Sequence, residues 1–196
     1  MEHIVESIIR LDHDLFFIIN GAHCPFLDPL MKILSNIPVW LPLYLMIVGG
    51  LFMVLPWKKA LVALGGILLT LLLTDQISSS LIKEWVQRIR PCHVPGWEGR
   101  IHLLESKGGL YSFISSHAAN VFGLTAFTSL VYRKKWYTIL LFLWAVMVSY
   151  SRIYVGKHFP ADVICGALFG MLLGWIVYKI YSFVILKMKK HALPDR

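Results

Sequence analysis

The stretch "ALVALGGILLTLLLTDQISSSLI", residues 60–82, decides the fold, because Asp75 is the only charged residue in it. A helix of about 20 apolar residues crosses the hydrocarbon core of a bilayer, which is about 30 Å thick. Four more stretches of this kind lie at 38–57, 118–132, 136–150 and 163–186, the last broken only by Lys179. The sequence therefore predicts an all-α fold, a polytopic membrane helical bundle with five to six transmembrane helices.

Composition and charge support the same class of protein. Of the 196 residues, 57% are hydrophobic and 15% are charged, whereas soluble domains carry about 25% charged residues. The net charge of +8 would also fit a nucleic-acid-binding protein. However, basic clusters at 58–59, 133–135 and 187–190 all fall at one side of the predicted bundle. The positive-inside rule makes that side the cytoplasm, so no nucleic acid partner is needed to explain the charge.

The first 35 residues differ from the rest, because acidic residues alternate there with Ile, Leu and Phe. This pattern predicts amphipathic helices on the outer membrane interface, broken near "NGAHCP" at 20–25, with a tilted sixth half-span as the alternative. The start lacks the basic region of a signal peptide, so we expect it to be retained. We divide the chain into interfacial helices at 1–35, a transmembrane core at 36–190 and a cytoplasmic tail at 191–196.

Several single residues have a structural interpretation. Asp75 would cost roughly 2.5 to 3.5 kcal/mol if it faced lipid at mid-bilayer, so we expect it to face the bundle and meet a serine or Asn120. Cys24 and Cys92 share the outer side, and the sequence leaves open whether they form a disulfide. Gly166, Gly170 and Gly174 form a small-residue stripe that favours close helix packing within the monomer. Cys165 is interpreted as a packing residue in the last span.

A second group of basic residues lies on the outer side, where the orientation rule disfavours them. Lys83 and Arg90 are seven residues apart, so both point from one helical face if the helix continues to Pro91. This spacing suits a shared anion site. The other basic residues of the same loop, Arg88, Arg100 and Lys107, are interpreted as solvated charges.

The stretch "SRIYVGKHFPAD", residues 151–162, places His158 four residues before Asp162. The carboxylate can hold one imidazole nitrogen and leave the other free as a nucleophile. In "SSHAAN", residues 115–120, Ser115 is a candidate helix cap beside His117, and a helix start binds anions. A two-metal site would need more carboxylates than these cationic loops supply, which favours covalent histidine chemistry. The expected phosphate ligands are Lys83, Arg90 and Arg152.

Three motifs together resemble the signature of the type 2 phosphatidic acid phosphatase superfamily: Lys83 separated by six residues from Arg90-Pro91, then "SSH" at 115–117, then Arg152 separated by five residues from His158, with three more residues before Asp162. The resemblance implies that His158 forms a phosphohistidine, that Asp162 orients it, and that His117 protonates the leaving oxygen and then activates water. It also implies that no metal or cofactor takes part. The phosphoryl oxygens would be held by Lys83, Arg90, Ser115, Ser116 and Arg152.

This family usually reads Pro-Ser-Gly-His where the chain has Ile114-Ser115-Ser116-His117, so Ser116 replaces a glycine. The resemblance implies a lipid phosphate substrate in a bacterial cytoplasmic membrane. The positive-inside rule predicts an active site facing the periplasm or exterior and a cytoplasmic C-terminus. Undecaprenyl diphosphate is the first expectation, with lipid A 1-phosphate and phosphatidylglycerol phosphate as alternatives. The alternative of another class is a non-catalytic lipid-phosphate transporter. We expect a monomer that contacts the bilayer and no nucleic acid.

Overall fold

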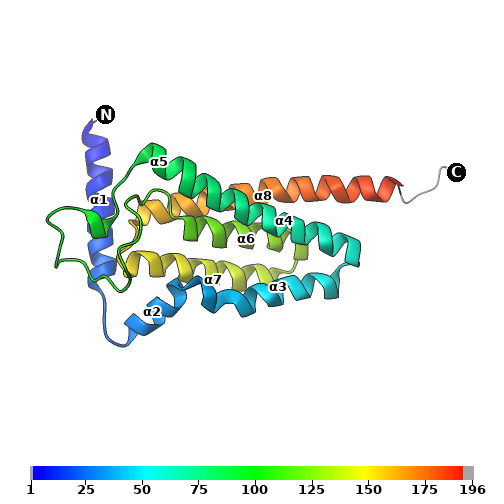
Figure 1. Ribbon diagram of the computed structural model, residues 1–196, viewed down its shortest axis with the longest axis horizontal. Helices are drawn as coiled ribbons and strands as arrows, with labels where there is room; N and C mark the ends of the chain where they lie inside the picture. Colours follow the sequence, from blue (N-terminus) through cyan, green and yellow to red (C-terminus); the bar gives the residue numbers. More distant parts are fainter. Residues whose placement is uncertain (1, 192–196) are drawn as a thin grey trace.

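The computed structural model describes residues 2–191, and within them the chain is helical with no strand (Figure 1). This confirms the predicted all-α membrane bundle. The predicted tail lies outside the described residues except for His191. The helices are α1 (Glu2–Gly21), α2 (Leu27–Ser35), α3 (Leu41–Val54), α4 (Trp57–Gln76), α5 (Lys83–Val86), α6 (Ser116–Tyr132), α7 (Lys135–Tyr154) and α8 (Pro160–His191), with the short turns η1 (Ile37–Trp40), η2 (Ile77–Ile82, π-helical) and η3 (Pro91–His93).

Within residues 2–191, four helical stretches are long and apolar enough to cross a membrane: Ile37–Val54, Trp57–Val86, Lys135–Tyr154 and Pro160–Lys190. The remaining predicted span, 118–132, corresponds to α6, which is a shorter helix of 17 residues. It lies among α4, α7 and α8 and is the most enclosed helix of the bundle (Figure 1). No residue of α6 is exposed, so its neighbours cover this helix on all sides.

The predicted glycine stripe allows the backbone of α8 to pack directly against the backbone of α6. A Cβ atom on Gly170 would lie 2.2 Å from the carbonyl oxygen of Ala119, and one on Gly166 would lie 2.5 Å from that of Ser115. No side chain fits at either position, so only glycine allows this approach. The stripe thus packs inside the monomer, as predicted, and fixes the start of α6 beside the start of α8.

The helices alternate in direction, so that the ends of α5 and α7 meet the starts of α6 and α8 at one end of the bundle. The N-terminal helix α1 crosses this same end, together with the long loop 87–115 (Figure 1). The break between α1 and α2 falls at 22–26, where a break was predicted. Cys24 and Cys92 are both free, so the disulfide that the sequence left open is not formed.

Candidate active site

His158 and Asp162 lie side by side where α7 passes into α8. The segment that joins α7 to α8 turns at Gly156, which has a φ of +82°. A Cβ atom at this position would lie 2.9 Å from Ile101 Cγ2, so the turn requires glycine. Asp162 Oδ2 lies 3.6 Å from His158 Nδ1 and accepts a hydrogen bond of 2.9 Å from the Phe159 amide at the helix start. Both side chains are buried, at 2% and 0% exposure.

Burial determines the protonation state of His158. Loss of solvation lowers the pKa of His158 from 6.5 to about 4, although the Asp162 carboxylate acts in the opposite direction. The ring is therefore neutral at pH 7. Since Nδ1 faces Asp162, Nε2 is the nitrogen left with a lone pair for attack on phosphorus.

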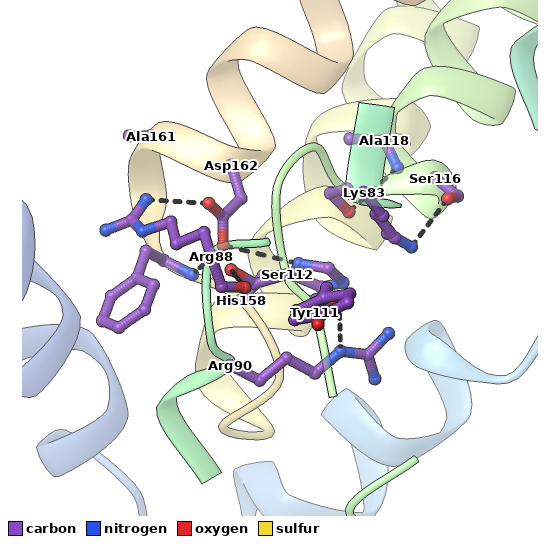
Figure 2. A network of polar contacts seen from close by, with 12 residues as sticks. Lys83, Arg88, Arg90, Tyr111, Ser112, Ser116, Ala118, His158, Ala161 and Asp162 are labelled. Carbon is purple, nitrogen blue, oxygen red and sulfur yellow. Dashed lines mark hydrogen bonds and ion pairs between the residues drawn. The ribbon is translucent and has the colours of Figure 1, made fainter. Parts of the chain in front are cut away.

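Arg88 joins this pair to the N-terminal helix, which corrects its interpretation as a solvated charge. Its Nη1 lies 2.8 Å from Asp162 Oδ1, and its Nη2 lies 2.5 Å from Asp12 Oδ2. The guanidinium also stacks 4.0 Å above the Phe159 ring. Asp12 is itself buried and accepts a hydrogen bond of 2.8 Å from the Ala161 amide. Asp162, which faces His158, is thus held by Arg88 of the long loop (Figure 2). Arg88 is in turn paired with Asp12 of α1.

Lys83 and the start of α6 form the second part of the site. Lys83 Nζ donates to Ser116 Oγ at 2.9 Å (Figure 2). Ser78 Oγ donates to the same oxygen at 2.8 Å. Ser115 caps α6 as predicted, because its Oγ accepts from the Ala118 amide at 3.4 Å. Ser116 is the first residue of the helix, so this position does not use the positive φ that glycine would allow.

Arg90 reaches the site by another route than the sequence predicted. The helix does not continue to Pro91: α5 ends at Val86, and Gln87 takes a left-handed conformation with φ of 52°. The chain then runs extended, and Arg90 Nε donates to the carbonyl of Tyr111 at 3.0 Å. The prediction of one shared helical face was therefore wrong, because the helix stops four residues too early. Burial lowers the pKa of Arg90.

Arg152 is buried and bound to two acceptors. Its Nη1 contacts Ser35 Oγ at the end of α2 and lies 3.3 Å from Glu105 Oε2 in the long loop. Glu105 in turn accepts a hydrogen bond from Ser35 Oγ. The Glu105 carboxylate thus lies against Arg152, a residue that was predicted to bind phosphate.

His117 connects these groups. It is the second residue of α6, directly after Ser116, whose Oγ accepts a hydrogen bond from Lys83 Nζ. It lines a cavity of about 640 Å³ together with Arg152, Glu105 and Lys32. The structure therefore brings the two histidines and the three predicted phosphate-binding cations to one end of the bundle.

Residues 63–185, more than half of the chain, match the sequence model of the PAP2 superfamily. This chain belongs to the PAP2 superfamily. It is 37% identical over 180 residues to a lipid A 4'-phosphatase of Porphyromonas gingivalis, covering 91% of this chain and 76% of the relative. It is 33% identical to an undecaprenyl-diphosphatase of Sulfolobus acidocaldarius over 90% of this chain and 82% of the relative.

The crystal structure of a transmembrane PAP2-type phosphatidylglycerolphosphate phosphatase from Bacillus subtilis has the same fold. The TM-score is 0.67 at 25% identity, covering 91% of this chain and 88% of that structure. Together these relationships make the protein a PAP2 lipid phosphatase, a phosphoric ester hydrolase, and a multi-pass membrane protein.

Several contacts of this PAP2 site could not be found from its motifs. Arg88 is two residues from the motif arginine, but nothing in its neighbourhood marks it as buried. Asp12 lies 150 residues from Asp162 along the chain, and in sequence it does not differ from the other acidic residues of the N-terminal stretch. A signal for Asp12 does exist, since it lies one turn before the buried Phe16 on α1. Ser35 and Glu105 carry no comparable signal.

Proposed function

We propose that this PAP2 enzyme hydrolyses a phosphate monoester of a glycolipid of the lipid A type, through a phosphohistidine intermediate at His158. The observation that carries the proposal is the chain of contacts behind the nucleophile. Nδ1 of the neutral His158 ring faces Asp162 Oδ2 at 3.6 Å, and Asp162 is fixed by Arg88 at 2.8 Å. The similarity to a lipid A 4'-phosphatase supports this substrate over the sequence-based expectation of undecaprenyl diphosphate.

The proposed reaction has two steps. In the first, His158 Nε2 attacks phosphorus, the bond to the lipid oxygen breaks, and His117 donates a proton to that oxygen. In the second, His117 takes a proton from water as the water oxygen attacks phosphorus. The phosphorus–nitrogen bond then breaks and inorganic phosphate leaves.

The cations around the two histidines stabilise the negative charge that gathers on the phosphoryl oxygens in both steps. We assign this role to Lys83, Arg90 and Arg152, with Ser115 and the amide of Ser116 at the start of α6. Arg152 exchanges Glu105 for the phosphate when substrate enters. Ser116 contributes by directing Lys83.

We also propose the orientation and organisation of the chain. The site end of the bundle faces the periplasm or exterior of a bacterial cytoplasmic membrane, because the basic clusters at 58–59, 133–135 and 187–190 lie at the opposite end. The C-terminus is then cytoplasmic. Residues 1–35 form an interfacial unit over the core at 36–190, and the protein acts as a monomer.

A second candidate substrate is undecaprenyl diphosphate. It is favoured by the similarity to an undecaprenyl-diphosphatase and by an additional cation, Lys157, which is buried beside the site and contacts the carbonyl of Ser106. A diphosphate carries more negative charge than a monoester and suits a larger cationic cluster.

A panel assay separates these possibilities. Purified protein in detergent is offered lipid A, undecaprenyl diphosphate, phosphatidic acid and phosphatidylglycerol phosphate, and released phosphate is measured. We expect the highest kcat/KM for lipid A, and loss of release in His158→Ala but not in His3→Ala, an exposed histidine. Binding without release by the wild-type protein would instead favour the non-catalytic transporter.

A further inference from the structure

A second cavity adjoins the site and enters the bundle beneath His117. It has a volume of about 290 Å³ and shares Ser35, Ile37 and His117 with the larger polar cavity. Most of its remaining lining is apolar, with Leu34, Trp40, Leu71, Val121 and Val148. A molecule whose phosphate lies beside His117 can therefore place the adjoining part of its lipid chain here.

This apolar cavity contains a carboxylate. Asp75 and Asn120 both line it, and both are only half-buried because the cavity reaches them. Asn120 Nδ2 lies 3.4 Å from Asp75 Oδ1, and Asn120 Oδ1 accepts a hydrogen bond of 2.7 Å from Thr74 Oγ1. An ionised carboxylate can only accept hydrogen bonds, so the NH2 group of Asn120 faces Asp75 and its amide oxygen faces Thr74.

Asp75 retains unused capacity to accept hydrogen bonds. A carboxylate offers about four acceptor sites. Within residues 2–191, the single long contact from Asn120 is the one side-chain hydrogen bond that it receives, and no cation lies within ion-pair distance of it. A polar group surrounded by apolar side chains is unfavourable unless a partner bonds to it. The cavity is thus suited to an occupant that carries a donor.

The position of the pair defines where that donor lies. Asn120 follows His117 by three residues on α6, which corresponds to about 4.5 Å along the helix axis. The donor is therefore about one helical turn deeper in the membrane than the phosphate. Hydroxyl or amide groups near the head of an acyl chain lie at this depth, whereas a polyprenyl chain is a hydrocarbon without donors.

We propose that Asp75 and Asn120 form a specificity site that binds a hydroxyl or amide N–H on the lipid chain next to the phosphorylated head group. The inference rests on the proposed function and deepens it. The enzyme selects acyl glycolipids with hydroxylated or amide-linked chains over polyprenyl phosphates. It does so because an occupant lacking the donor leaves the Asp75 carboxylate without a partner.

The test uses two synthetic N-acylglucosamine phosphates that differ only in a hydroxyl on the third carbon of the acyl chain. Phosphate release gives kcat/KM for each lipid. We expect the wild-type protein to prefer the hydroxylated lipid by about tenfold or more, the range of a hydrogen bond to a charged group. We expect Asp75→Asn and Asp75→Leu to reduce this ratio, mainly by slowing release from the hydroxylated lipid.

The matched control is Gln76→Leu, because Gln76 is the next residue on α4 and its side chain is exposed. This control should keep the wild-type ratio. A wild-type ratio near one overturns the inference while leaving the proposed function intact, and that measurement does not depend on how the variants fold. An equal loss on both lipids in the Asp75 variants also overturns it, since Asp75 would then act through the fold. Absence of release from both lipids by the wild-type protein overturns the proposed function as well.

Discussion

Arg88 holds Asp162 at 2.8 Å and Asp12 at 2.5 Å, so one guanidinium links the carboxylate beside the proposed nucleophile to the first helix of the chain. The side chain of Arg88 is 22% exposed, while the two carboxylates are nearly buried. Ion pairs with this degree of burial constrain geometry more than exposed pairs do. The arrangement connects α1, within the interfacial unit proposed at 1–35, directly to the proposed active site.

Replacing Arg88 by Lys should lower kcat about tenfold or more and change KM little. Lysine keeps the charge but cannot bridge two carboxylates with a planar fork, so Asp162 would no longer be held in one orientation. The measurement is steady-state phosphate release together with thermal unfolding in detergent. Arg100→Lys, in the same loop, is the control and should retain activity. An equal loss in both variants would show that the loop, not the contact, is responsible.

Replacing Asp12 by Asn should reduce activity although it lies far from the motifs in sequence. The change removes the negative charge that pairs with Arg88, and an amide is a weaker acceptor than a carboxylate. Asp14→Asn is a close control, because Asp14 lies two residues away and is exposed. We expect kcat to fall several-fold or more only for Asp12→Asn. Full activity of that variant would contradict the assigned role of α1.

The ring of His158 should remain neutral in mildly acidic solution. Burial lowers its pKa to about 4, so nitrogen-15 NMR of labelled histidines, assigned with a His158→Asn variant, should place its titration near that value. The unfolded chain binds a proton at this position below about pH 6.5 whereas the folded chain does not. This group therefore makes the fold less stable as the pH falls from 6.5 towards 4. A midpoint at or above 6.5 would contradict the buried geometry.

Gly170→Ala should destabilise the protein by about 1 to 3 kcal/mol, since the added Cβ would lie 2.2 Å from the Ala119 carbonyl and force α6 and α8 apart. Activity should fall as well, because these helices carry His117 and Asp162. Gly65→Ala is the control, as a Cβ there meets nothing within 4 Å. Thermal unfolding of both variants in one detergent is the measurement, and similar melting temperatures would contradict the close packing.

Chelation should leave activity unchanged. The cations Lys83, Arg90 and Arg152 that surround the two histidines would repel a divalent ion, and the proposed reaction uses side chains alone. Phosphate release is measured before and after exhaustive treatment with EDTA. Vanadate should inhibit, because its trigonal-bipyramidal adducts resemble the state in which phosphorus is transferred. Loss of activity that added metal restores would contradict the covalent histidine route.

The sequence predicts the membrane bundle because hydrophobic length and the distribution of basic residues are local properties. The stretch 60–82 is long enough to be identified as a span by itself, and basic clusters fix the relative orientation of the ends. The glycine stripe on α8 likewise appears as a repeat of four in sequence. A charged residue that faces lipid is unfavourable, which predicts that Asp75 faces the interior of the bundle and contacts a residue such as Asn120, as observed.

The contacts behind the site depend on how distant segments fold together, and local patterns carry little information on them. A helical extension from Lys83 to Arg90 is the natural prediction from spacing, yet Gln87 takes a left-handed conformation and ends the helix. Asp12, Ser35 and Glu105 come from α1, α2 and the loop, which reach the site only in the folded bundle. Their roles therefore required coordinates.

The most direct test is to identify the residue that carries the phosphoryl group during turnover. The protein is mixed with a lipid substrate labelled with radioactive phosphate, quenched rapidly, digested and mapped at neutral or alkaline pH. We expect an acid-labile label on His158 in the wild-type protein that is absent in His158→Asn. Turnover with no label, or with label on another residue, would contradict the role assigned to His158.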